Sequence, residues 1–181
     1  MQTAAETKYF LGCKLTRTNA ILLAVGLLFV SAAVAAKMNT RYEVRWNISE
    51  SIKANFFIID KNILPSRGEY AAFNYYDITN EHYKSGMLKT PPKVVFIKKV
   101  IGVAGDTVSR QNREFFVNGQ SAGIAKIKSK GGRPLKDNEF QGVIPRGYYY
   151  VHTPHKDSYD SRYADVGLIP IAEIRGVAYA Y

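Results

Sequence analysis

The chain has 181 residues, 46% of them hydrophobic and 22% charged, and this composition excludes a disordered protein. Its single cysteine, Cys13, excludes an internal disulfide framework. The formal net charge of +10 indicates an anionic partner or an anionic surface.

The first long apolar segment is Ala20–Ala36, which carries no charged residue and one serine. Its length is at the short end of what crosses a bilayer as a helix. Lys8, Lys14 and Arg17 precede it, against a single acidic residue, so the positive-inside bias predicts a cytoplasmic N-terminus. A cleavable signal peptide is the alternative, because Ala33–Ala35 reads as an A-x-A cleavage site.

A retained anchor fits this region better than a signal peptide. The stretch before the apolar run is long for a signal, and the run has no polar end. We therefore predict a cytoplasmic segment at residues 1–19, a transmembrane anchor at 20–36 and an extracytoplasmic body at 37–181.

Beyond the anchor, short β-prone runs are separated by turn sequences such as SRGE, AGD, NGQ and IPRG. No segment of useful length with helical periodicity follows the anchor. The pattern predicts a mainly β body, a folded β-barrel that is closed in part, with strands at residues 56–60, 70–76, 93–103, 107–110, 114–119, 148–153 and 176–181.

Two adjacent lysines, Lys98 and Lys99, lie inside the apolar run at residues 96–102. Successive side chains of a strand point to opposite faces, so the two ammonium groups cannot share one side. If one of them is buried, it tends to lose its proton and can act as a general base. The alternative is an edge strand on which both lysines are solvated.

The three histidines, His82, His152 and His155, lack metal-ligand spacing, and no phosphate-binding glycine loop is present. The sequence therefore predicts neither a metal nor a cofactor.

A basic stretch at residues 126–136 holds Lys126, Lys128, Lys130 and Arg133 around a Gly-Gly pair. It predicts an exposed loop that contacts anionic lipid headgroups or nucleic acid, or that is only solvated. No aromatic–basic nucleic-acid motif is evident and the body is predicted outside the cytoplasm, which argues against nucleic acid as a partner.

Four segments resemble, in order, the conserved boxes of the signal peptidase I (leader peptidase) family. Phe96–Val108, FIKKVIGVAGDTV, is similar to that family's lysine box, and Asn47–Ile52, NISESI, to its nucleophile box. Ile63–Phe73 resembles the R-G-D segment, and Asp157–Tyr163, DSYDSRY, matches the terminal S-x-D-S-R box. Within the family the chain looks most like the conjugative-transfer TraF-type serine peptidases.

Three departures from the family pattern are visible. Lys53 stands where proline usually follows the nucleophile, so the preset backbone of proline is lost. Ala104 also stands where proline is usual in the lysine box, and the approach to the terminal box reads VHTPHKDS instead of the common G-D-N run.

The resemblance implies a Ser–Lys dyad, in which a lysine of lowered pKa activates a serine nucleophile. It implies a catalytic set of Ser51, Lys98 and Asp160. It also implies an oxyanion donor and site-bracing residues: Ser49, Ser158 and Arg162.

The activity implied by the resemblance is cleavage of the leader segment of exported precursors, with maturation of a conjugative pilin precursor as the specific case. The expected partners are the precursor protein, membrane lipid and other components of a conjugation or secretion system. The expected location is a bacterial inner membrane, crossed once, with the catalytic domain in the periplasm. The alternatives are a general signal peptidase I, or a catalytically inactive anchored assembly factor of a secretion channel.

Overall fold

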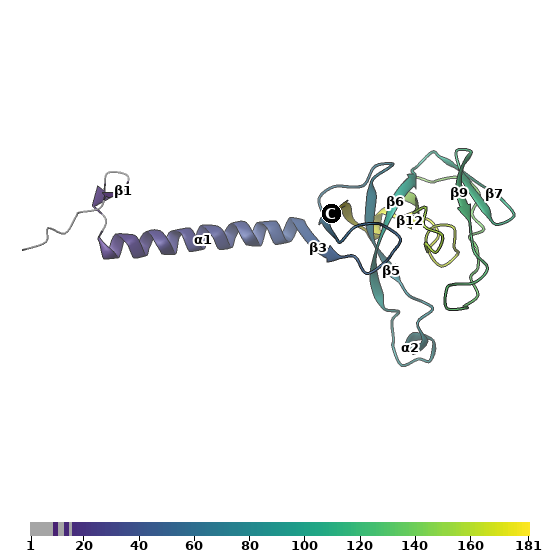
Figure 1. The fold of residues 1–181 in the computed structure, drawn as a ribbon, viewed down its shortest axis with the longest axis horizontal. Coiled ribbons are helices and arrows are strands. Elements are labelled where there is room, and N and C mark those ends of the chain that lie inside the picture. Colours follow the sequence, from purple (N-terminus) through teal and green to yellow (C-terminus); the bar gives the residue numbers. More distant parts are fainter. Residues whose placement is uncertain (1–8, 11–12, 15) are drawn as a thin grey trace, which may run out of the picture. The chain divides into compact units, whose positions relative to one another are not determined.

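The computed structural model describes residues 9–10, 13–14 and 16–181 (Figure 1). The chain divides into two compact units, Met1–Arg41 and Tyr42–Tyr181. Most of the predicted cytoplasmic segment, residues 1–19, lies outside the described residues.

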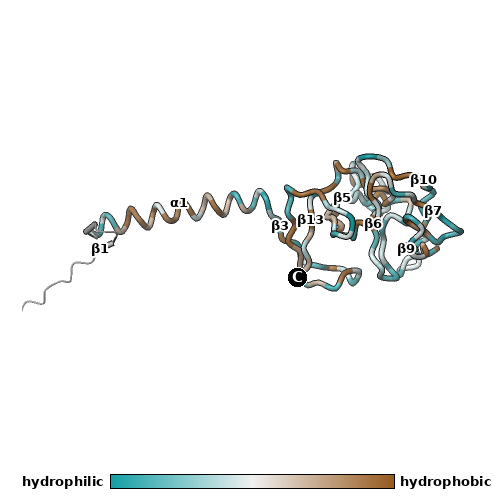
Figure 2. Tube along the Cα trace, turned by 90° about the horizontal axis from the view of Figure 1, so that it is seen from above, coloured by the Kyte–Doolittle hydropathy of each residue, from teal (hydrophilic) through white to brown (hydrophobic). Residues whose placement is uncertain are grey.

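The first unit contains a short antiparallel pair, β1 (Tyr9–Phe10) and β2 (Cys13–Lys14), followed by α1 (Arg17–Arg41). The predicted anchor at residues 20–36 lies within α1, and none of the helix residues is buried. At 1.5 Å per residue the helix is about 37 Å long, more than the roughly 30 Å hydrocarbon core of a bilayer. By length and composition it can span a membrane, and Figure 2 shows its predominantly hydrophobic residues.

The second unit is built on a seven-stranded sheet in the order β12-β11-β6-β5-β13-β4-β3, and every pairing in it is antiparallel. Its strands are β3 (Tyr42–Trp46), β4 (Phe56–Asp60), β5 (Tyr70–Tyr76), β6 (Lys93–Gly102), β11 (Tyr148–His152), β12 (Ile169–Pro170) and β13 (Ile174–Ala180).

A smaller antiparallel sheet has the order β10-β7-β8-β9. Its strands are β7 (Thr107–Gln111), β8 (Glu114–Val117), β9 (Gln120–Ile124) and β10 (Gly142–Val143). One helical turn, α2 (Glu81–Lys84), lies in the β5–β6 connection, and a 3₁₀ turn (Ile171–Glu173) precedes β13.

The mainly β prediction is confirmed, and all seven predicted runs contain strands. Within residues 42–181 the hydrogen-bonded neighbours form two open sheets and not one closed ring. The sequence did not predict β3, whose charged Glu43 and Arg45 obscure its strand character. This strand forms because it pairs with β4 along its whole length.

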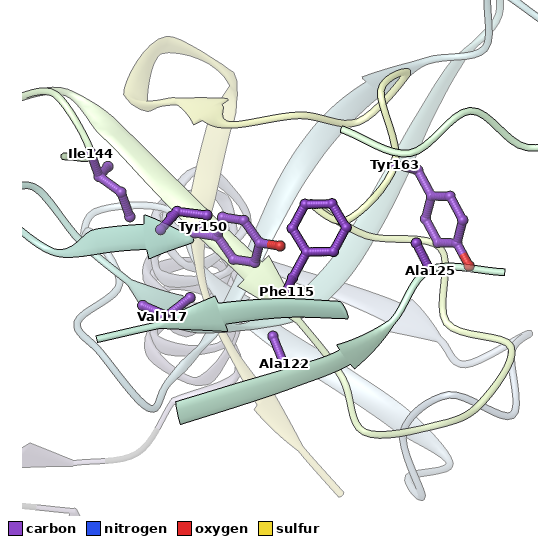
Figure 3. Packing of buried hydrophobic residues seen from close by; sticks show 8 residues of the cluster. Phe115, Val117, Ala122, Ala125, Ile144, Tyr150 and Tyr163 are labelled. Carbon is purple, nitrogen blue, oxygen red and sulfur yellow. The ribbon is translucent and has the colours of Figure 1, made fainter. Parts of the chain in front are cut away.

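The two sheets of the body share a hydrophobic core. Tyr150 of β11 packs against Phe115 and Val117 of β8, together with Ile144 and Tyr163 (Figure 3). Each of these side chains is at most 5% exposed. This cluster fixes the smaller sheet against the strand that leads into the terminal S-x-D-S-R box.

The turn after β6 explains the glycine and aspartate pattern of the lysine box. A Cβ on Gly102 would lie 2.6 Å from Ile144 Cδ1, so only glycine fits there without a shift. Gly105 has a φ of +91°, which L residues with a side chain rarely adopt. Asp106 accepts a hydrogen bond from the Val103 amide at 2.7 Å and pairs with Arg67 at 2.5 Å. The R-G-E segment and the lysine box are therefore one structural unit.

Candidate active site

The loop at residues 47–55, between β3 and β4, carries the predicted nucleophile, Ser51. The Asn47 side chain closes this loop by donating hydrogen bonds to the carbonyl oxygens of Ile52 and Ala54, both at 2.8 Å. Ile52 is buried in a cluster with Phe57 and other residues of the large sheet. The buried isoleucine and the closed loop hold the adjacent Ser51, which is partly exposed, at the surface of the body.

Lys98 and Lys99 lie on opposite faces of β6, as strand alternation predicts. Lys98 is 7% exposed, whereas Lys99 is exposed to solvent. The Lys98 amine lies 3.3 Å from Ser51 Oγ and 3.2 Å from Ser158 Oγ. The tertiary structure thus brings together a serine, a lysine and a second serine from three separate segments of the chain.

The environment of Lys98 favours a neutral amine. Burial lowers the pKa of Lys98 from its ordinary value, and the positive charge of Arg162 lowers the pKa further. The carboxylate of Asp160 acts in the opposite direction, but burial dominates. An amine in this setting can accept a proton from a neighbouring hydroxyl.

A buried network lies behind the amine. Ser158 Oγ donates a hydrogen bond to Asp160 Oδ2 at 2.7 Å, and Arg162 Nε donates to Asp160 Oδ1 at 2.8 Å. Asp160 is 0% exposed and Arg162 3%. Burial alone would raise the pKa of Asp160, but hydrogen bonds from His152 and Arg162 outweigh it and lower this pKa to about 2. The carboxylate is therefore charged at neutral pH and orients Ser158.

The S-x-D-S-R segment is fixed to β11 by its second serine, Ser161. Ser161 is fully buried, and its hydroxyl accepts a hydrogen bond from the Val151 amide at 2.9 Å. Asn138 donates a side-chain hydrogen bond to the Ser161 carbonyl oxygen at 2.9 Å. These contacts account for the second serine of the motif, to which the sequence assigned no role.

Three further residues of the site were not identified from sequence. Thr153 Oγ1 lies 2.5 Å from Ser158 Oγ, and His152 Nδ1 lies 3.0 Å from Asp160 Oδ2. Asn47, described above, closes the nucleophile loop. All three lie within or beside the motifs that the sequence analysis identified, but their residue types gave no signal. Threonine and asparagine commonly bond to nearby backbone in turns, and His152 lacks metal-ligand spacing with the other histidines.

Ser49 lies beside the predicted nucleophile. Its hydroxyl is 3.0 Å from Ser51 Oγ, and its amide donates a hydrogen bond to Asn47 Oδ1 at 3.1 Å. A hydroxyl at this position can donate to an oxyanion that develops next to Ser51 Oγ.

A cleft of about 580 Å³ contains Ser51 and Lys98 and follows β6 along residues 93–98. Strand β5 pairs with this part of β6 on one side, whereas β11 pairs only with Lys99, Val100 and Gly102 on the other. Within residues 16–181, the second edge of β6 at residues 93–98 therefore has no partner strand. An open strand edge beside a serine–lysine pair can receive an extended peptide.

No group of three or more His, Cys, Asp or Glu side chains that could hold a metal ion occurs in the part of the chain that the structure describes.

Comparison with known proteins assigns the family. The family described as "Signal peptidase, peptidase S26" matches residues 15–181. A probable conjugal transfer protein TraF from Sinorhizobium fredii is 40% identical over 85 residues, which is 45% of this chain and 43% of that protein. A signal peptidase I from Pseudomonas fluorescens is 26% identical over 163 residues, covering 68% of this chain and 52% of that protein.

Among solved structures, a signal peptidase I from Enterococcus faecalis matches 63% of this chain and 96% of its own, with 24% identity and a TM-score of 0.36. The chain spans about half the length of the curated relatives that it matches. Because the family match covers the whole body and α1, this chain belongs to the signal peptidase family, peptidase S26.

Proposed function

We propose that this protein is a membrane-anchored serine endopeptidase in which Ser51 and Lys98 form a catalytic dyad that cleaves the leader segment of exported precursors. The observation that carries the proposal is the buried Lys98 amine, 3.3 Å from Ser51 Oγ and 3.2 Å from Ser158 Oγ. Membership of the signal peptidase family supports the same reaction class.

The proposed chemistry begins with a neutral Lys98 amine. It takes the proton of Ser51 as Oγ attacks the carbonyl carbon of the scissile bond. The Ser51 amide and the Ser49 hydroxyl stabilise the oxyanion. Lys98 then gives its proton to the leaving amine, and a water molecule, deprotonated by Lys98, hydrolyses the acyl-enzyme.

Ser158, Asp160 and Arg162 have the role of orienting Lys98 in this scheme. The family resemblance implies Asp160 in the catalytic set, and its contact with Ser158 at 2.7 Å supports action through that hydroxyl. Arg162 forms an ion pair with the buried Asp160 carboxylate. Asp160 therefore stays ionised, while the positive charge of Arg162 offsets its tendency to keep Lys98 protonated.

The precursor binds in extended form along the open edge of β6. Residues 93–98 offer unpaired backbone groups, and the cleft beside them is lined by apolar side chains such as Val95 and Ile97. Pairing with the strand edge would hold the scissile bond at Ser51, while side chains of the precursor enter the cleft.

A conjugative pilin precursor is the specific substrate that we propose. It is favoured by the similarity to a probable conjugal transfer protein TraF, at 40% identity over 85 residues. α1 would anchor the enzyme in a bacterial inner membrane, with the cytoplasmic N-terminus that its flanking charges predict and the body in the periplasm.

The test is cleavage of a pilin precursor and of a generic preprotein in membranes that contain the full chain. Ser51→Ala and Lys98→Ala should abolish cleavage, whereas Lys99→Ala, the matched lysine on the opposite face of β6, should retain it. Cleavage that persists in Ser51→Ala would exclude the serine mechanism. If the wild type cleaves neither substrate, the inactive anchored assembly factor becomes the better account, and preference for the generic preprotein would indicate a general signal peptidase.

A further inference from the structure

The basic stretch at residues 126–136 forms a tight β-hairpin. The Leu135 amide donates to the Ile127 carbonyl oxygen and the Ser129 amide to the Arg133 carbonyl oxygen, both at 2.8 Å. Lys128 and Pro134 pair across the hairpin. We call residues 127–135 the basic hairpin; it follows β9 along the chain in Figure 1.

The base of the basic hairpin is fixed to the body by one arginine. The Arg113 guanidinium donates to the carbonyl oxygens of Ala125, Lys126 and Leu135 at 2.7 to 3.2 Å, and it pairs with Asp137. The hairpin is therefore a positioned element of the fold and not a freely solvated loop.

The tip of the basic hairpin reaches the rim of the catalytic cleft. Lys130 Nζ lies 3.9 Å from the Glu50 carboxylate, and Glu50 directly precedes Ser51. The Arg133 guanidinium lies 5.7 Å from the ring centroid of Tyr159, which directly follows Ser158. Glu50 and Tyr159 both line the cleft.

Positive charge is in excess at this rim. Lys128 has no ion-pair partner among the described residues, and Arg133 contacts a ring and no carboxylate. The pair between Lys130 and Glu50 is long and both side chains are 80% exposed, so it contributes little and exchanges readily. Lys130 and Arg133 at the rim, with Lys128 in the same hairpin, are available to a ligand that carries negative charge.

The open edge of β6 directs a bound peptide toward this charge. The edge ends at Lys98, because β11 occupies it from Lys99 onward. A peptide paired with residues 93–98 must leave the sheet beside Ser51 and Lys98, and the rim there is formed by Glu50, Tyr159 and the tip of the basic hairpin.

We infer that the basic hairpin determines specificity for the precursor. Lys130 and Arg133 bind acidic side chains of the precursor on one side of the cleavage site, in the part of the peptide that extends beyond the edge of β6. This inference rests on the proposed peptidase function and adds a substrate feature to it. A precursor with acidic residues on that flank is selected over a neutral one, through contacts that are exposed and screened by salt.

An anionic bilayer surface is the competing ligand for the same cations. The peptide is favoured because Lys130 contacts the residue before Ser51, the proposed nucleophile, and Arg133 contacts the residue after Ser158, which orients Lys98. Lipid binding requires no such placement.

The experiment measures kcat/KM for full-length enzyme in liposomes of neutral lipid. Three kinds of precursor are compared. The first carries two acidic residues before the cleavage site, the second carries two after it, and the third carries Asn or Gln in place of these acidic residues. Lys130→Gln/Arg133→Gln is compared with Lys136→Gln/Arg146→Gln, which removes the same charges from exposed positions that do not line the cleft.

Wild type and control are expected to prefer the acidic precursor by about threefold to tenfold, on one flank only. The hairpin variant should reduce this preference to below about twofold and should cleave the neutral precursor as wild type does. In 0.5 M NaCl the wild type should lose its preference in the same way, because the Debye length shortens to about 3 Å to 5 Å. Equal loss of preference in the control, or no preference in wild type, would overturn the inference.

Two further measurements distinguish failure of the peptidase function and lipid binding by the hairpin from failure of the inference. Binding of the same peptides to Ser51→Ala, followed by fluorescence anisotropy, tests the hairpin even if no precursor is cleaved, so failure of the peptidase function is distinguishable. If the hairpin substitutions instead slow every precursor equally, and only in liposomes of anionic lipid, the basic hairpin binds lipid and the inference is wrong.

Discussion

The Ser158 hydroxyl lies 3.2 Å from the Lys98 amine, and this contact joins the amine to a buried carboxylate. Ser158 Oγ donates to Asp160, and Asp160 is held in turn by Arg162 and His152. The polar groups around the lysine are thus satisfied, while the lysine itself remains in a setting that disfavours its charge.

Activity should fall on the acid side of the Lys98 pKa. Burial lowers that pKa below the ordinary lysine value, and only the neutral amine can accept the Ser51 proton. Below the pKa, kcat/KM should drop about tenfold per pH unit, whereas activity should persist at higher pH. A pH–rate profile of precursor cleavage checks this. Activity that does not fall as the pH is lowered would contradict a neutral Lys98 base.

Removing the Ser158 hydroxyl should slow cleavage without abolishing it. Ser158→Ala frees the Lys98 amine from one of its two serine contacts, and loose positioning of a catalytic group costs about tenfold to hundredfold in kcat. Thr153→Val, which removes a contact to Ser158 but keeps its bonds to Lys98 and Asp160, should cost less. Equal kcat for Ser158→Ala and wild type would contradict this role.

Asp160 should make the protein sensitive to acid. Its folded-state pKa of about 2 is lower than the unfolded value, so its stabilising contribution is complete above about pH 5 and is lost as the pH falls through 2. The loss should be about 2 kcal/mol of the free energy of unfolding. Urea unfolding followed by far-UV circular dichroism measures it. In Asp160→Asn this component should be missing, and an unchanged acid limb in that variant would exclude the assignment.

Asp106 should matter more for stability than its partner Arg67. Asp106→Ala leaves the Val103 amide and the Asn118 side-chain amide without their acceptor, which should cost about 1 to 3 kcal/mol. Arg67→Met removes an ion pair whose arginine side chain is 46% exposed, so the cost should be below about 1 kcal/mol. Denaturant unfolding of the two variants gives the comparison, and a larger loss in Arg67→Met would show that the ion pair dominates.

The sequence predicted the strands best where apolar residues dominate, as at β4 and β6, because burial of such runs is decided locally by composition. It did not predict β3, with its charged Glu43 and Arg45, because that edge strand is stabilised by pairing with β4. The sequence also left the role of the basic hairpin open, because its charge alone does not show which part of the body or which partner the basic side chains face.

By itself, the sequence determined the apolar helix, the mainly β body, and the opposite orientation of Lys98 and Lys99, because these follow from composition and from the two-residue period of a strand. Only the tertiary structure decided that Ser51, Lys98 and Ser158 meet, and that His152 and Thr153 join them. Those contacts link segments that are far apart in the chain, and no local pattern encodes a distance that depends on how the strands pair and how the core packs.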